Sequence, residues 1–256
     1  QLLQMEWWTN RGDWASQGLQ EKFNLFTKIA EHLPDAIHIF DRGYAGQPWL
    51  NIFFEHQAQF ILRWNSTYLL ADLHGNAKHA WQLVAGKKIM ASKYIWDSQR
   101  KQRRIVGMLY TEIRHPKFPN ERLWLVVSKH GKGQTPWYII TNMPVLSNKD
   151  AWFIIHAYAK RWEIEQSFRT CKSELALESP RLKFWHNRMK IMHMVSLVYA
   201  FLLAIFHTTP HSIRQILLNF WCKRTGKRYS LAKVPLYRLR LALANLWNYR
   251  MSQNSG

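Results

Sequence analysis

The feature that most constrains the fold is a short apolar run at residues 36–40, which ends at the tetrapeptide Asp41-Arg42-Gly43-Tyr44. An apolar run of this length before a glycine turn predicts a buried strand with Asp41 at its carboxyl end. The pattern then predicts a helix over Pro48–Gln59 and a second strand over Phe60–Trp64. Such a strand–helix–strand unit is typical of an α/β fold, in which Asp41 would lie at the sheet edge where open α/β sheets place their chemistry.

The segments on either side of this unit have a different character. A strand is expected over Leu2–Trp8, and a helix over Gln17–His32 that Pro34 would end. Between Tyr68 and Met143, β-branched and aromatic runs alternate with turn signals. Strands are expected there at residues 93–96, 103–114, 123–130 and 137–143. This pattern predicts a mainly antiparallel β insertion.

Helical periodicity dominates the remainder of the chain. A long helix is expected from Ala151 to Leu177, ending before Pro180, and further helices at 188–207 and 212–224. The apolar run Ile191–Phe206 is shorter than the ~20 residues that cross a bilayer, so we interpret it as a buried core helix rather than a membrane span. We therefore expect three parts: a partial core with the acidic strand end (1–66), a β-rich insertion (67–145) and a helical, basic C-terminal region (146–256).

The charge balance predicts a polyanionic partner. The 256 residues carry 36 Lys and Arg against 16 Asp and Glu, a formal net charge of +20. A surplus of this size indicates nucleic acid more simply than an anionic membrane. Thirteen basic residues and no acidic residue follow Glu178, which favours a phosphate-tracking surface over an ordinary solvated face. Two cysteines cannot provide a disulfide scaffold, and a reducing cytoplasm suits the chain.

One face of the long predicted helix combines a single acid with cations and a phenol. These residues are spaced three, four, four and three apart and would lie within about 80° of one another on an α-helix: Tyr158, Arg161, Glu165, Arg169 and Lys172. An adjoining apolar stripe is expected to pack the helix against a sheet: Phe153, Ala157, Ile164, Phe168, Cys171 and Leu175. Two interpretations remain open: an exposed face tied by i,i+4 pairs of ~0.2–0.5 kcal/mol each, or a metal-binding carboxylate flanked by phosphate-binding cations.

The spacing Tyr158-x2-Arg161-x3-Glu165-x6-Lys172 resembles the Tyr-Arg-Glu-Lys signature of bacterial insertion-sequence DDE transposases. The motif that begins at Asp41 resembles the second acidic motif of the same family, again at a strand end. The order of acid on a strand, β-rich insertion and acid on a helix is also similar, and the resemblance covers most of residues 30–180. It implies an RNase H-like α/β core interrupted by a mainly antiparallel β insertion, with a helical basic C-terminal part.

The resemblance implies that Asp41 and Glu165 are two of the three catalytic carboxylates that hold two Mg²⁺ ions, for which Mn²⁺ can substitute. The family's first aspartate lies on an early strand, whereas Asp13 and Asp35 stand in turn-like contexts. We therefore expect the first metal carboxylate to lie outside this chain, which begins with Gln rather than Met and is interpreted as a segment of a longer product. On this view the segment alone does not cleave DNA.

The resemblance also implies a DNA-binding set. Tyr158, Arg161 and Lys172 would bind the phosphate beside a base flipped out of the DNA end, and Arg169 is a further phosphate contact. Trp137 is similar in position to a tryptophan that stacks on the flipped base in the family. Ordinary strand packing is the alternative role for Trp137.

The implied function is that of a DNA transposase acting by Mg²⁺-dependent phosphodiester hydrolysis and strand transfer. Its partners would be the transposon end repeats, the target DNA and a second copy of the chain in a homodimeric synaptic complex. We expect it in the bacterial cytoplasm at the nucleoid, with no membrane involved. Two alternatives remain: a catalytically inactive DNA-binding remnant that lacks the first aspartate, and a nuclease on the same core that does not transpose.

Overall fold

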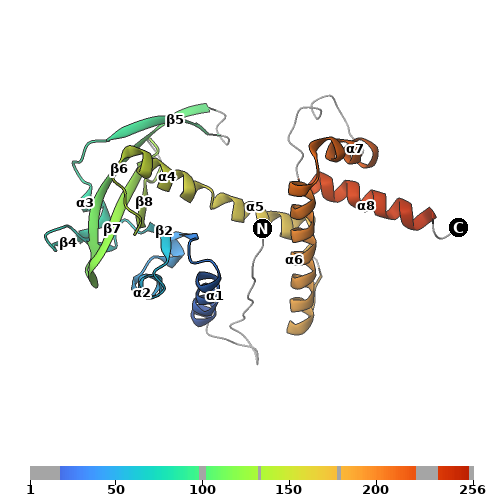
Figure 1. The fold of residues 1–256 in the computed structure, drawn as a ribbon, viewed down its shortest axis with the longest axis horizontal. Coiled ribbons are helices and arrows are strands. Elements are labelled where there is room, and N and C mark those ends of the chain that lie inside the picture. Colours follow the sequence, from blue (N-terminus) through green and yellow to red (C-terminus); the bar gives the residue numbers. More distant parts are fainter. Residues whose placement is uncertain (1–17, 98–101, 132–133, 178–179, 223–235, 254–256) are drawn as a thin grey trace. The chain divides into compact units, whose positions relative to one another are not determined.

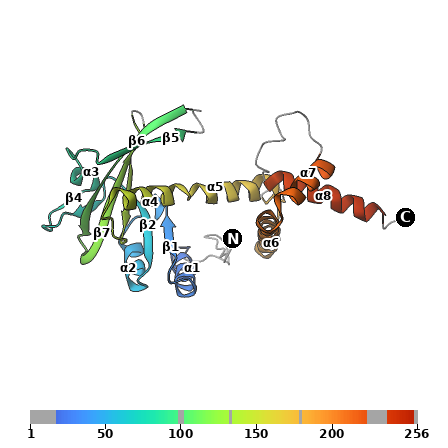
Figure 2. The same ribbon diagram turned by 45° about the horizontal axis from the view of Figure 1, so that its top comes forward.

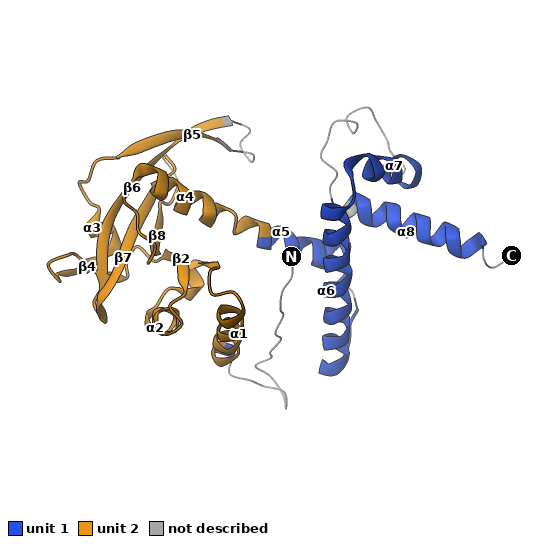
Figure 3. Ribbon diagram, in the orientation of Figure 1, with its two compact units in different colours: residues 1–18, 164–256 blue, residues 19–163 orange. Residues whose placement is uncertain are grey.

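The computed structural model describes residues 18–97, 102–131, 134–177, 180–222 and 236–253 (Figure 1). The chain divides into two compact units, a larger one of residues 19–163 and a smaller one that contains residues 164–256 (Figure 3). The strand expected over Leu2–Trp8 lies outside the described residues. The expected division into three parts at residues 66 and 145 stays a prediction. It separates a core from its insertion, whereas the two units differ only in which residues pack together.

The larger unit is a mixed α/β structure. Its elements in chain order are α1 (Gly18–His32), β1 (Ile37–Phe40), a 3₁₀ turn η1 (Arg42–Tyr44), α2 (Gln47–Glu55), β2 (Gln59–Trp64), β3 (Leu69–Ala71), β4 (Ala77–His79), α3 (Ala80–Leu83), β5 (Ala91–Asp97), β6 (Gln102–His115), β7 (Phe118–Lys129), β8 (Trp137–Thr141) and α4 (Asn148–Ala159). The strand–helix–strand unit and the four long insertion strands are confirmed, although α2 ends earlier than expected. The short elements β3, β4 and α3 were not anticipated.

The strands form one sheet in the order β1-β2-β8-β7-β6-β3-β4, with β5 paired to β6. β1 and β2 are parallel, and the other pairings are antiparallel. The expected α/β fold with a mainly antiparallel insertion is thereby confirmed. The expectation that β1 is buried is wrong: all four of its residues are half-buried, because β1 is the outermost of the described strands in the sheet.

Helices cover both faces of the sheet. Successive side chains of a strand point to opposite faces, so each strand can contribute to the core on either side. In β2, Phe60 and Leu62 join the core formed with α1 and α2, whereas Ile61 joins the core formed with α4. Figure 2 shows α1 and α2 on one side of β2 and α4 on the other. The alternation in β2 therefore defines an α4 face of the sheet, which carries the residues discussed below.

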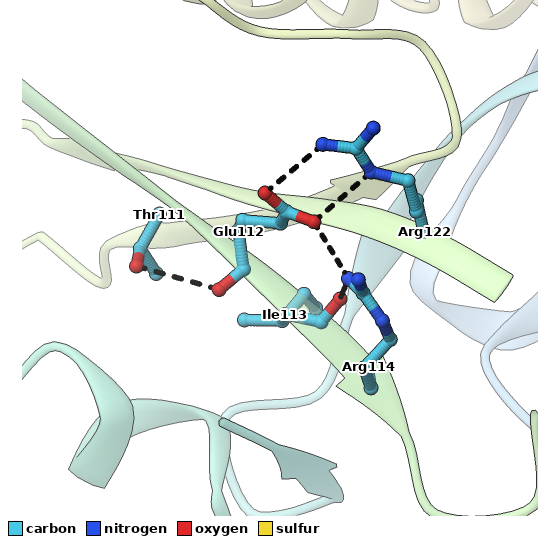
Figure 4. Close-up of polar contacts among 5 residues, drawn as sticks. All are labelled: Thr111, Glu112, Ile113, Arg114 and Arg122. Atoms are coloured by element: carbon cyan, nitrogen blue, oxygen red, sulfur yellow. Dashed lines mark hydrogen bonds and ion pairs between the residues drawn. The ribbon is translucent and has the colours of Figure 1, made fainter. Parts of the chain in front are cut away.

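The hairpin of β6 and β7 is tied on its surface by one acid and two cations. Glu112 accepts hydrogen bonds from Arg114 at 2.8 Å and from Arg122 at 3.1 and 3.3 Å (Figure 4). These two arginines, Arg122 first, hold the pKa of the Glu112 carboxyl below its usual range. The cluster joins neighbouring strands of the insertion, and the exposure of Arg122 limits what its ion pair with Glu112 contributes to stability.

The smaller unit is helical, as expected for the C-terminal region. It contains most of α5 (Trp162–Arg169), a π-helical turn η2 (Thr170–Glu174), α6 (Trp185–Thr208), α7 (His211–Trp221) and α8 (Leu236–Gln253). The helices expected at 188–207 and 212–224 are confirmed as α6 and α7, and α8 was not anticipated. Among its described residues, one buried cluster consists of Leu218, Cys222 and Ala242.

The expectation that the apolar run in α6 forms a buried core helix is wrong. Leu202 is the one buried residue in α6, whereas Leu197 and Phe201 are 71% and 59% exposed. The described residues of this unit leave most of the 24-residue helix uncovered. α6 is long and apolar enough to cross a bilayer by length and composition, which for a single helix is weak evidence.

A single helix from Ala151 to Leu177 is also not observed. The backbone tightens at Arg161, whose N–H donates to the Tyr158 carbonyl three residues back, and α5 begins at the next residue. In the π turn, Leu175 donates to the Thr170 carbonyl five residues back. The uniform 100° step of an α-helix is therefore lost at both places.

The expected apolar stripe is wrong as well. Phe153, Ile164 and Phe168 are exposed. The residues of α4 that pack on the sheet are instead Ala151, Trp152, Ile154, Ile155 and Tyr158. Tyr158, expected on the polar face, therefore belongs to the buried face of α4.

We predict that Phe53→Ala will lower the free energy of unfolding by about 3–5 kcal/mol, because Phe53 is fully buried and its ring packs on Phe40 and Phe60. The measurement is urea unfolding followed by circular dichroism. Phe153→Ala is the matched control and should change stability by less than about 0.5 kcal/mol, since Phe153 is exposed. An equal loss of unfolding free energy in the two variants would contradict the burial of Phe53 in the core.

Candidate active site

Five neighbouring strands bring chemically active side chains to one end of the sheet. The pairing directions place the carboxyl ends of β1, β2 and β7 beside the amino ends of β8 and β6. Five residues at this end each lie two positions along the chain from a residue that packs against α4. Since side chains two apart on a strand point to the same face, all five lie on the α4 face. The residues that pack against α4 are Ile39, Ile61, Val106, Val126 and Ile139. The five residues at this end are Asp41 directly after β1, Arg63 on β2, Trp137 on β8, Ser128 on β7 and Arg104 on β6.

Asp41 is fixed at one carboxylate oxygen and more open at the other. Its Oδ1 accepts the Arg42 backbone N–H at 2.7 Å, which caps η1, and the Tyr158 hydroxyl at 3.2 Å. Its Oδ2 lies 4.0 Å from Nη1 of Arg161. The side chain is 50% exposed, so this carboxylate is oriented by the protein and still reachable from solvent.

Tyr158 connects α4 to the strand ends. Only 2% of it is exposed, and its ring meets the Trp137 ring edge-on at 5.1 Å between centroids. Burial raises the pKa of Tyr158, and a hydrogen bond from Arg63 opposes that shift. The hydroxyl therefore stays protonated at neutral pH and donates to Asp41, while its oxygen accepts from Arg63.

Two arginines lie against the aromatic pair. The guanidinium carbon of Arg63 is 5.8 Å from the centre of the Trp137 ring, and that of Arg161 is 5.7 Å from the centre of the Tyr158 ring. Arg161 was predicted from sequence, whereas Arg63 was missed. The signal was a cation inside an apolar strand, in phase with Ile61, which indicates a side chain on the functional face rather than on the surface.

His130, just beyond β7, is a buried polar residue that was also missed. It is 7% exposed, its ring centroid lies 4.4 Å from that of Trp137, and its Nε2 is 3.1 Å from the Ser128 hydroxyl oxygen. Burial, followed by the charges of Arg104 and Arg63, lowers the pKa of His130 to about 4. The ring is therefore neutral at pH 7.

The remaining predicted site residues belong to the smaller unit. Glu165 and Arg169 stand on α5, and Lys172 stands in the π turn. Lys172 lines a cavity of about 670 Å³ together with three more cations and several apolar side chains. The cations are Arg181, Lys183 and Arg188, and the apolar residues include Phe168 and Met192. The structure thus brings together Asp41, Trp137, Tyr158 and Arg161 in one unit, and describes Glu165, Arg169 and Lys172 in the other.

The carboxylate chemistry of the site suits a hard divalent cation. Mg²⁺ prefers oxygen ligands, and Asp41 offers an oriented, half-exposed carboxylate at the end of the sheet. Within the described parts of the chain, no three His, Cys, Asp or Glu side chains come together as a metal-binding group. Asp41 thus offers one oriented carboxylate with the chemistry of a metal ligand.

His130→Gln should flatten the dependence of stability on pH between about 6.5 and 4. Since folding lowers the pKa of His130 from 6.5 to about 4, the unfolded chain binds more protons in this window, and stability falls as the pH is lowered. The full loss, reached near pH 4, is on the order of 3 kcal/mol. Urea unfolding at a series of pH values measures it, with His74→Gln at an exposed histidine as control. A wild-type slope in His130→Gln would contradict the assignment.

Comparison with known protein families gives an independent result. The chain matches the family described as "Transposase DDE domain" over residues 20–201. This span includes the sheet, α4, α5 and most of α6, and with them each of the predicted site residues. The mixed α/β architecture agrees with the RNase H-like core implied by the sequence resemblance. The chain belongs to the DDE transposase family.

Proposed function

We propose that the chain is the catalytic part of a DNA transposase, which hydrolyses phosphodiester bonds at transposon ends and joins the freed 3′-hydroxyl to target DNA. The observation that carries this proposal is the convergence of Asp41, Arg63, Arg161 and Trp137 at one end of the sheet. A carboxylate for a metal, cations for phosphate and an aromatic ring for a base are the groups that such a reaction needs.

Asp41 and Glu165 are the metal ligands in this proposal. A bound Mg²⁺ ion, or Mn²⁺ in its place, would neutralise the phosphodiester and lower the pKa of the attacking water. Tyr158 and the Arg42 N–H hold Oδ1 of Asp41, so Oδ2 is the oxygen that we assign to the metal. The chain thereby fixes the direction of the carboxylate before substrate binds.

The DNA is bound by cations and one aromatic side chain. Arg63 and Arg161 hold the phosphate next to Asp41, since a guanidinium matches the geometry of non-bridging oxygens. Trp137, half-buried beside them, stacks on a base released from the duplex end. Arg169 and Lys172, with the cations that line the cavity of the smaller unit, contact further phosphates. The thirteen basic residues after Glu178 extend the same charge.

The wider setting follows from this chemistry. The partners are the transposon end repeats, target DNA and a second copy of the chain, because two DNA ends must be cut and joined together. The reaction takes place on DNA in the bacterial cytoplasm, at the nucleoid and without a membrane.

Asp41→Asn or Glu165→Gln in the full-length gene product should reduce Mg²⁺-dependent cleavage of plasmid DNA carrying the end repeats by at least about 100-fold, since each removes a metal ligand. Nicking followed on gels measures this, and Fe²⁺-induced self-cleavage of the protein locates the metal. Asp35→Asn, at an exposed acid in a turn, is the control. Unchanged cleavage in either variant contradicts its assignment, and a wild-type product that binds DNA and never cuts it is the inactive remnant.

Arg63→Ala should weaken DNA binding and lower the slope of log K against log salt by roughly 0.9, the value for one phosphate contact on duplex DNA. Fluorescence anisotropy between low and physiological salt measures the slope. Arg122→Ala is the control, because it removes the same charge from an exposed arginine that pairs with Glu112. Equal slopes for wild type and Arg63→Ala would remove Arg63 from the phosphate site.

A further inference from the structure

We propose that His130, fixed by Ser128, is a positioning residue that holds the Trp137 indole in the orientation in which it stacks on a DNA base. The inference rests on the proposed function, in which Trp137 receives that base. It assigns a role in DNA recognition to the end of β7, in the β insertion, where sequence analysis found no site residue.

The contacts form a short chain from the sheet to the indole. Ser128 and Trp137 are direct partners in the pairing of β7 with β8, so the backbone brings the two residues together. The Ser128 hydroxyl is fully buried and lies 3.1 Å from Nε2 of His130. The His130 ring in turn packs on Trp137 with centroids 4.4 Å apart and planes inclined by 58°. A hydrogen bond at one ring nitrogen fixes the rotation of the imidazole, and the imidazole then limits the rotation of the indole.

The burial of His130 is costly, which argues against simple space filling. Its Nδ1 is buried and has no hydrogen-bond partner among the described residues. A buried polar atom left unpaired lowers stability, whereas an apolar side chain of similar size would fill the same space without that cost. A half-satisfied polar residue in a core therefore indicates that the hydrogen bond to Ser128 has a use beyond packing.

His130 is one of three supports around Trp137. Tyr158 from α4 meets the indole edge-on at 5.1 Å, and Arg63 from β2 lies 5.8 Å from its ring centre. Both of these residues also belong to the Asp41 site, because Tyr158 binds the carboxylate and Arg63 binds Tyr158. His130 is the support that contacts Trp137 without contributing to that hydrogen-bonded group, so replacing it tests the orientation of the indole separately.

The experiment compares two DNA probes bound to the 256-residue chain. Both are the same short duplex with one unpaired nucleotide at a 5′ end, which carries adenine in one probe and is abasic in the other. The ratio of the two dissociation constants isolates the contribution of the base from that of the phosphates. For the wild type we expect roughly a five- to hundredfold preference for the probe with the base, the range measured for base–aromatic stacking.

His130→Ala should lose most of this preference while keeping the wild-type affinity for the abasic probe. His130→Gln should retain much of it, since the amide can still bond to Ser128. Ser128→Ala removes the hydrogen bond with little change in volume and should reduce the preference too, which keeps the test valid if His130→Ala does not fold. His115→Ala is the matched control: His115 is equally buried and packs on Trp64 and Phe118, away from Trp137, so its preference should equal that of the wild type.

The outcomes separate the inference from the function on which it rests. A wild-type preference in both His130→Ala and Ser128→Ala, with a lost preference in Trp137→Ala, overturns the role of His130 and leaves the stacking role of Trp137 in place. An unchanged preference in Trp137→Ala overturns the stacking role, and the inference about His130 with it. A loss in His115→Ala equal to that in His130→Ala assigns the effect to general destabilisation and also overturns the inference.

Discussion

The hydrogen bond from the Tyr158 hydroxyl to Asp41 joins two segments that are 117 residues apart in the chain. It exists because α4 packs across the sheet through its buried residues, and the burial of Ile154 and Ile155 stabilises the contact by about 1.5–3 kcal/mol for each. This packing sets the position of the Tyr158 ring. The ring then sets three other side chains: Asp41 through the hydroxyl, Trp137 through its edge and Arg161 through its face. The geometry of the site is therefore a consequence of helix–sheet packing rather than of local sequence.

The charges around this packed centre are unbalanced. Arg161 lies beside the Asp41 carboxylate, Arg63 binds the Tyr158 hydroxyl that donates to it, and the charges of Arg104 and Arg63 are among the causes that keep His130 neutral. Like charges held close together in a partly desolvated place lower the stability of the fold. An anion that binds among them relieves that repulsion, and by linkage it stabilises the folded state. A phosphate of the DNA backbone is the anion that the family's chemistry supplies.

Local patterns in the sequence were sufficient for some of this arrangement and insufficient for the rest. The strand ending at Asp41 could be predicted because an apolar run before a glycine turn is a short-range signal. The face of α4 could not, because the choice between the stripes of Phe153 and Trp152 depends on which one meets the sheet. That Arg63 and His130 both lie beside Trp137 depends on the pairing order of β2, β8 and β7, which is set by contacts far apart in the chain. Strand alternation alone would have assigned Arg63 to the face of Ile61.

The interruption of the helix at Arg161 affects how easily the Arg161–Asp41 ion pair can separate when other ions bind. The bond from the Arg161 N–H to the Tyr158 carbonyl keeps the guanidinium near both the Tyr158 ring and Asp41. At 4.0 Å the Arg161–Asp41 pair is a weak ion pair, since a charge-assisted hydrogen bond would be about 1 Å shorter. In the proposed function a divalent cation takes over the carboxylate and a phosphate takes over the guanidinium. The cost of separating the pair is small, so binding of metal and DNA can proceed together while the hydrogen bond from Tyr158 keeps Asp41 in place.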